Sequence, residues 1–171
     1  MWLFFTRIVA IPPIDRDAYT YGVSTIFGTS STQFLDVTIP IERAIQLAEP
    51  KFARRSPPVD PLNNLWFKDQ VNHDAPWDIK RERPWRETIG STYPGSYDTE
   101  VIFQNKIESL ESIGNMTYGY LGTAMGYPLD VLLSGGDYAD GGITGLFSRS
   151  DSHKDKSDIV RGVQWYNRTP R

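Results

Sequence analysis

The chain has 171 residues, of which 39% are hydrophobic and 13% aromatic, so it can form one globular domain and is not a disordered tail. Its formal net charge of -3 and its lack of cysteine exclude disulfides, thiolate nucleophiles, thiolate zinc sites and a global positive field that would attract nucleic acid. The apolar run within residues 1–13 is too short to span a bilayer, and Arg7 follows rather than precedes it, so neither a membrane span nor a signal peptide is expected.

Residues 1–60 are predicted to form an N-terminal arm or a small β-rich extension. Runs of β-branched and aromatic residues at 4–11, 21–28 and 34–41 are separated by prolines and glycines, a pattern typical of short strands. Residues 41–53 follow as a helical fragment, which Pro50 should end or kink. The proline-rich segment after this fragment reads as a linker, so a second domain is expected over residues 61–171.

The second domain is predicted to begin with a helix entered from the polar turn at residues 60–64. Residues 77–99 are rich in Trp, Pro and Gly, which favours an ordered loop anchored in the core by Trp77 and Trp85. The next segment, residues 101–115, is predicted to be a helix. Its expected buried positions are Ile102, Ile107 and Leu110.

Two further helices are expected towards the end of the chain. A short one begins at Pro128, which suits a first helical turn, and ends at two Gly-Gly pairs. The other covers residues 151–168 and places Ile159, Val163 and Tyr166 on one face at i, i+4 and i+7. The predicted fold class is therefore mainly α, a compact helical domain with long ordered loops preceded by a short β or extended N-terminal arm.

Glycines are concentrated in residues 114–126. On a helix, Asn115, Gly119, Gly122 and Gly126 fall on one stripe. Each interior glycine costs roughly 1 kcal/mol relative to alanine, so the stripe needs an offsetting gain. Close approach of a second helix or of a substrate would supply that gain, and the spacing leaves both interpretations open.

Three blocks of sequence, residues 66–80, 114–140 and 155–167, together resemble the polymorphic toxin type 44 domain of bacterial toxin systems. The resemblance covers roughly residues 62–168. It implies a predicted ribonuclease toxin, secreted or delivered into a target cell as the C-terminal part of a larger protein. It also implies action in the target cytoplasm, RNA as the substrate and neutralisation by a cognate immunity protein.

Cleavage of RNA through its 2′-hydroxyl needs a base, an acid and groups that stabilise negative charge on the phosphate. Neither a metal nor another cofactor is expected. A structural alternative remains open for several candidates, since Asp78 could close a turn, Tyr118 could be a core residue, Asn115 could cap a helix and His73 could be an idle loop residue. The candidate catalytic residues are Asp78, Lys80, His73, Asn115, Tyr118 and Glu111, and the candidate substrate-binding residues are Gly119, Gly122, Trp77 and Arg81.

Asp151, His153 and Asp155 alternate along the chain in a pattern that could bind a divalent ion. Capping of the last helix by Asp151 or Ser152 is the favoured interpretation of this segment.

Two other function classes remain open. A periplasmic glycan (peptidoglycan) hydrolase would use a carboxylate pair, Glu111 with Asp78 or with Asp137. A non-enzymatic interaction module would leave Asp78, Lys80 and Asn115 far apart or buried in separate roles. The ribonuclease hypothesis requires the basic segments 51–86 and 141–171 to converge, because the chain as a whole is acidic.

Overall fold

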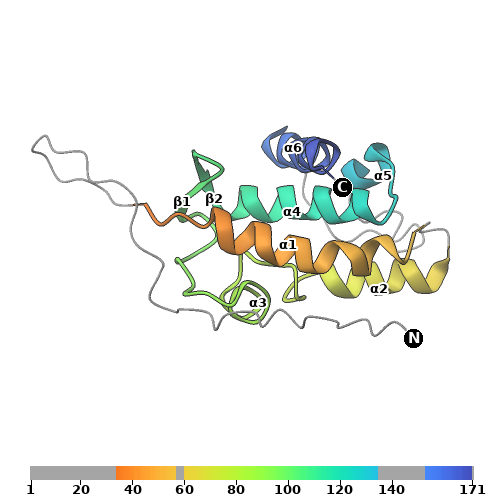
Figure 1. Ribbon diagram of the computed structural model, residues 1–171, viewed down its shortest axis with the longest axis horizontal. Coiled ribbons are helices and arrows are strands. Elements are labelled where there is room, and N and C mark those ends of the chain that lie inside the picture. The colour runs from red at the N-terminus through yellow and green to blue at the C-terminus, as the bar shows by residue number, and fades with distance from the viewer. Residues whose placement is uncertain (1–33, 57–59, 135–152, 171) are drawn as a thin grey trace, which may run out of the picture. The chain divides into compact units, whose positions relative to one another are not determined.

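The computed structural model describes residues 34–56, 60–134 and 153–170, so the strands expected at 4–11 and 21–28 lie outside the described residues. The described part is mainly helical, which confirms the predicted fold class. No helix within it is long and apolar enough to cross a membrane. The helices are α1 (Thr38–Ala53), α2 (Pro61–Val71), α3 (Glu82–Pro84), the π-helical turn η1 (Trp85–Ile89), α4 (Leu110–Ala124), α5 (Leu129–Ser134) and α6 (His153–Arg168), with one antiparallel hairpin of β1 (Glu100–Phe103) and β2 (Lys106–Ser109) (Figure 1).

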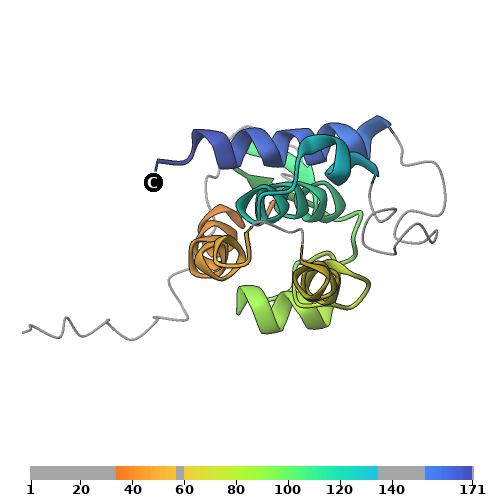
Figure 2. The same ribbon diagram turned by 90° about the vertical axis from the view of Figure 1, so that its right-hand side faces the viewer.

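Helix α4 lies at the centre of the core. Helix α1 runs alongside α4 and α6 crosses it, as the two views show together (Figures 1 and 2). The buried positions of α4 include Leu110, Ile113 and Leu121, none more than 1% exposed. Burial on several sides explains why α4 is apolar around much of its circumference.

The glycines of α4 are explained by helix packing. A Cβ atom on Gly119 would lie under 3.0 Å from the carbonyl oxygen of Ile159 in α6, and one on Gly162 of α6 would lie as close to the carbonyl oxygen of Met116. A Cβ atom on Gly122 would meet the side chain, not the backbone, of Leu132 in α5. The fourth member of the stripe, Gly126, lies just beyond α4 with φ 93° and ends the helix in a left-handed conformation.

The helix predicted over residues 101–115 is wrong in its first half. Gln104 and Asn105 both adopt positive φ, 50° and 62°, and form the two-residue turn of the β1–β2 hairpin. Ile107 is consequently 54% exposed rather than buried, whereas Leu110 is buried as predicted. Helix α4 begins only after Ser109, whose Oγ accepts a hydrogen bond from the Ser112 amide at 3.1 Å.

Helix α1 belongs to the same compact unit as the helices that follow it. This unit begins at Phe34, well before the boundary expected near residue 60. Ile41, Ile45 and Phe52 of α1 are each no more than 1% exposed and join the common core. The helix also continues through Pro50 to Ala53 rather than ending at the proline.

The segment between α2 and β1 is anchored by its tryptophans. Trp77 is 7% exposed and Trp85 fully buried, as expected from the sequence. The Nε1 atom of Trp85 donates hydrogen bonds to Ser91 Oγ and to the Thr92 carbonyl, both at 3.2 Å. This anchoring fixes the loop at residues 72–81 against α4, where the candidate site lies.

Candidate functional site

A pocket of about 280 Å³ lies between the loop after α2 and the first half of α4. It brings together most of the residues that the sequence singled out, including members of two separate blocks. Asp78, Lys80 and Asn115 therefore do not lie far apart, so the non-enzymatic hypothesis now rests on its second condition, burial of these residues in separate roles. The pocket is lined by Val71, Asn72, His73, Trp77, Asp78, Lys80, Arg81, Gly114, Asn115 and Tyr118.

Asp78 is the most constrained acidic group of the pocket, with only 7% of the residue exposed. Its Oδ2 atom accepts a hydrogen bond from the Asp74 amide at 3.0 Å and lies 3.7 Å from Nε of Arg81. Its backbone also closes a turn, since its amide donates to the Ala75 carbonyl at 2.9 Å. Asp78 therefore closes a turn, which was one of the two roles left open by the sequence. This turn places the Asp78 carboxylate on the pocket wall.

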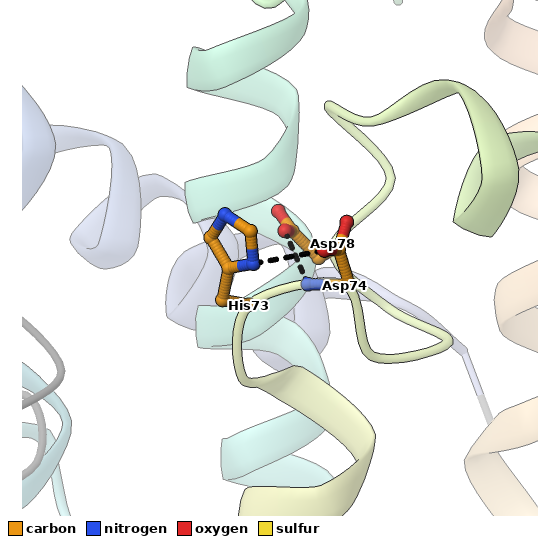
Figure 3. Close-up of side chains that lie close together, drawn as sticks. All are labelled: His73, Asp74 and Asp78. Atoms are coloured by element: carbon orange, nitrogen blue, oxygen red, sulfur yellow. Dashed lines mark hydrogen bonds and ion pairs between the residues drawn. The ribbon is translucent and has the colours of Figure 1, made fainter.

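His73, which lines the pocket, and its neighbour Asp74 lie close to Asp78 (Figure 3). The Nδ1 atom of His73 is 3.0 Å from Oδ2 of Asp74, and both side chains are more than half exposed. One ligand atom from each of His73, Asp74 and Asp78 lies within 4.8 Å of the other two. Asp74 could not be identified from the sequence as a site residue, because its φ of 58° turns the chain in a way that no local sequence pattern indicates.

Lys80 and Arg81 supply the positive charge of the pocket. The carbonyl of Lys80 accepts a hydrogen bond from the hydroxyl of Tyr93 at 2.7 Å, which ties the lysine to the loop behind it. Burial, and next the negative charge of Glu82, raise the pKa of Tyr93 above its ordinary value. The opposite wall is Gly114, where an added Cβ would lie 3.9 Å from the Lys80 side chain.

Asn115 and Tyr118 reach the pocket from α4. Asn115 is 8% exposed and its Nδ2 donates a hydrogen bond to Oδ1 of Asp155 at 2.9 Å. It does not cap the helix, because Ser109 has that role. The hydroxyl of Tyr118 is 3.4 Å from the Leu132 carbonyl, and its ring packs against Phe67 with centroids 5.8 Å apart.

Asp155 is the second residue near the pocket, after Asp74, that could not be identified from the sequence. It appeared in the sequence as part of an alternating pattern with Asp151, a residue that lies outside the described part of the chain together with Ser152. His153, the third member of that pattern, begins α6 and is exposed. The contact of Asp155 with Asn115 spans 40 residues, so only the crossing of α4 and α6 reveals it.

Three candidate residues lie outside the pocket lining, namely Glu111, Gly119 and Gly122. The geometry assigns the two glycines to helix packing, as described above. Glu111 lies in the first turn of α4, where its amide donates to the Tyr97 carbonyl at 2.8 Å. Asp137, its other proposed partner, lies outside the described residues.

The basic residues of the described chain do not converge on one pocket. Lys80 and Arg81 line the pocket described above, whereas Arg161 and Arg168 of α6 line a separate one of about 210 Å³ together with Lys106. Arg161 is also engaged by two acids, Glu108 and Asp158. The ribonuclease hypothesis requires the basic segments 51–86 and 141–171 to converge. Among the described residues of these two segments, only those of the first contribute Lys or Arg side chains to the candidate pocket, from the loop at residues 72–81.

Comparison with protein families matches the model of bacterial toxin 44 to residues 65–168, more than half of the chain. The matched region contains every residue that lines the candidate pocket. Searches of curated proteins and of solved structures gave no match.

Proposed function

The chain belongs to the bacterial toxin 44 family, and from this membership and the composition of its pocket we propose that it is a toxin domain that cleaves the RNA of competing cells. The observation that carries the proposal is the meeting of an imidazole, a buried carboxylate, two cationic side chains and an amide in one pocket. These are the groups that phosphodiester cleavage through the 2′-hydroxyl requires.

The imidazole, the two cationic side chains and the amide have distinct roles in the proposed reaction. His73 is the exposed proton-transfer group, and imidazole is the side chain best suited to that task near neutral pH. Lys80 and Arg81 bind the phosphate and stabilise the negative charge that develops on it. Asn115, held by Asp155, orients the bound nucleotide through its amide oxygen. His73 has its proton-transfer role in the metal-free protein, and no step of the proposed reaction uses a metal ion.

The cellular test compares two compartments. The chain is expressed in bacteria either in the cytoplasm or with a periplasmic export signal, and growth and total RNA are followed. The ribonuclease proposal expects growth arrest with RNA breakdown only from the cytoplasmic form. Asn115→Ala and His73→Ala should abolish the effect, while His153→Ala, which alters the only other histidine of the chain, should retain it.

A test with purified protein separates direct cleavage from a cellular response. Untagged protein is incubated with total RNA in a buffer containing EDTA, and the RNA is analysed on gels. Cleavage by the wild type but not by His73→Ala supports a metal-independent ribonuclease. RNA that stays intact under all conditions contradicts the proposal.

A periplasmic glycan hydrolase remains the second candidate, because carboxylate oxygens of Asp74 and Asp78 lie within 4.8 Å of each other. This is close to the roughly 5 Å that separates the two carboxyl groups of retaining glycosidases. The pair differs from the ones expected from the sequence, since Glu111 does not line the pocket. Lysis from the exported form alone, with RNA intact, would favour this activity.

Family membership also supports proposals about the biological setting. We expect delivery into the target cell as part of a larger secreted protein, and neutralisation by a cognate immunity protein. Co-expression with that partner should restore growth in the cytoplasmic assay above.

A further inference from the structure

We propose that His73, Asp74 and Asp78 form a binding site for one divalent transition-metal ion such as Zn²⁺ or Mn²⁺. The three side chains lie close together (Figure 3) and each offers one ligand atom, all within 4.8 Å of one another. Ligand atoms about 2.0–2.2 Å from one ion are roughly 3–4.4 Å apart. Small rotations of the exposed His73 and Asp74 side chains would close the remaining difference.

The local charges favour such an ion. Two carboxylates held this close repel each other, and an adjacent cation relieves that repulsion. Among the described residues, the cation nearest to Asp78 is Arg81, whose buried Nε atom lies 3.7 Å away and makes no hydrogen bond. Arg81 therefore makes no hydrogen bond to Asp78, and a metal ion between the three side chains would bind to both carboxylates directly.

The site combines one fixed ligand with two adaptable ones. The Asp78 carboxylate is 6% exposed and its Oδ2 is oriented by the amide of Asp74. The side chains of His73 and Asp74 are 66% and 52% exposed and can adjust to an ion. One imidazole and two carboxylates suit borderline metals, and the open pocket leaves the remaining coordination positions to water or a substrate oxygen.

This inference goes beyond the proposed function, because ion binding can be measured without RNA. Untagged, EDTA-treated protein is titrated with Zn²⁺ in a calorimeter, and Mn²⁺ binding is followed by electron paramagnetic resonance. Wild-type protein should bind one ion of each kind. His73→Ala and Asp78→Asn should weaken Zn²⁺ binding at least tenfold, while His153→Ala and Asp69→Asn, which alter exposed residues outside the cluster, should bind as the wild type does.

Binding that is absent in the wild type, or unchanged in His73→Ala, would overturn the inference. His73 is exposed, so its variant should fold, and circular dichroism checks this for both variants. A protein that binds Zn²⁺ at this cluster but leaves RNA intact would contradict the ribonuclease proposal and support the metal site. RNA cleavage by a protein that does not bind Zn²⁺ would support the ribonuclease proposal and contradict the metal site.

Discussion

Asn115 of α4 donates a hydrogen bond from Nδ2 to Oδ1 of Asp155 in α6, over 2.9 Å. This bond connects the pocket wall to a helix that contributes no lining residue of its own to that pocket. Because the amide hydrogen is engaged by Asp155, the Asn115 side chain has a defined orientation. Asp155 is therefore a positioning residue for the pocket.

Replacing Asp155 with alanine should lower toxicity and RNA cleavage by roughly 5- to 150-fold, equivalent to the 1–3 kcal/mol cost of leaving a buried polar group unsatisfied. Asp155→Asn keeps an acceptor oxygen and should recover much of the activity. The readout is the rate of RNA cleavage together with the melting temperature. Asp69→Asn, at an exposed position of α2, serves as the matched control. Equal loss in the Asn and Ala variants would show that the charge of Asp155, and not its acceptor role, is needed.

The crossing of α4 and α6 should tolerate no side chain at its two glycines. In Gly162→Ala and Gly119→Ala the new Cβ would clash with the carbonyl oxygen of Met116 and of Ile159, respectively. Backbone atoms of two packed helices cannot move away cheaply, so each variant should lose about 1–3 kcal/mol or more of unfolding free energy. Urea denaturation measures this loss.

Gly114→Ala is the control for the same substitution in the same helix. The nearest atoms to its added Cβ are 3.9 Å away, and alanine is favoured over glycine within a helix by roughly 1 kcal/mol. This variant should therefore be as stable as the wild type or more so. A loss of stability at Gly114 equal to that at Gly162 would contradict the packing explanation.

Much of the pocket could be predicted from sequence because its residues lie in two short motifs. Asp78 and Lys80 come from one, Asn115 and Tyr118 from the other, and the structure brings them together. Asp155 could not be assigned, since its role depends on which helix crosses α4. Whether the glycine stripe faced a helix or a substrate was undecidable for the same reason.

The errors in the predicted fold have local physical causes. The β1–β2 hairpin turns at Gln104 and Asn105, without the glycine that normally signals such a turn. The apolar spacing of residues 101–110 therefore resembled a helix. The boundary expected near residue 60 stays a prediction; it rests on prolines, which do not indicate that α1 packs against α4.

Removing α1 should unfold the domain. A fragment of residues 34–171 retains the whole compact unit, whereas a fragment of residues 61–171 lacks the buried Ile41, Ile45 and Phe52. Each of these side chains contributes about 2–5 kcal/mol on truncation to alanine, and a domain of this size has only about 5–15 kcal/mol in total. The longer fragment should melt cooperatively in circular dichroism and the shorter one should not. A cooperative transition in both fragments would support the boundary expected near residue 60.

Tyr93 should make the stability of the domain fall at alkaline pH. Its hydroxyl donates to the carbonyl of Lys80, and burial raises its pKa above the ordinary value of 10.0. Above pH 10 the folded state therefore retains a proton that the unfolded state releases, so the unfolding free energy decreases as pH rises. The contribution is complete below pH 10 and is lost as the pH passes through the folded pKa.

Comparison with Tyr93→Phe isolates this group from the other tyrosines. The variant lacks the hydrogen bond and should be about 1 kcal/mol less stable at pH 8. That difference should shrink as the pH rises above 10, because only the wild type has a proton to lose at this position. Urea denaturation of both proteins between pH 8 and 11 measures it. A difference that stays constant over this range would mean that the phenol of Tyr93 is ionised as easily in the folded protein as in the unfolded chain.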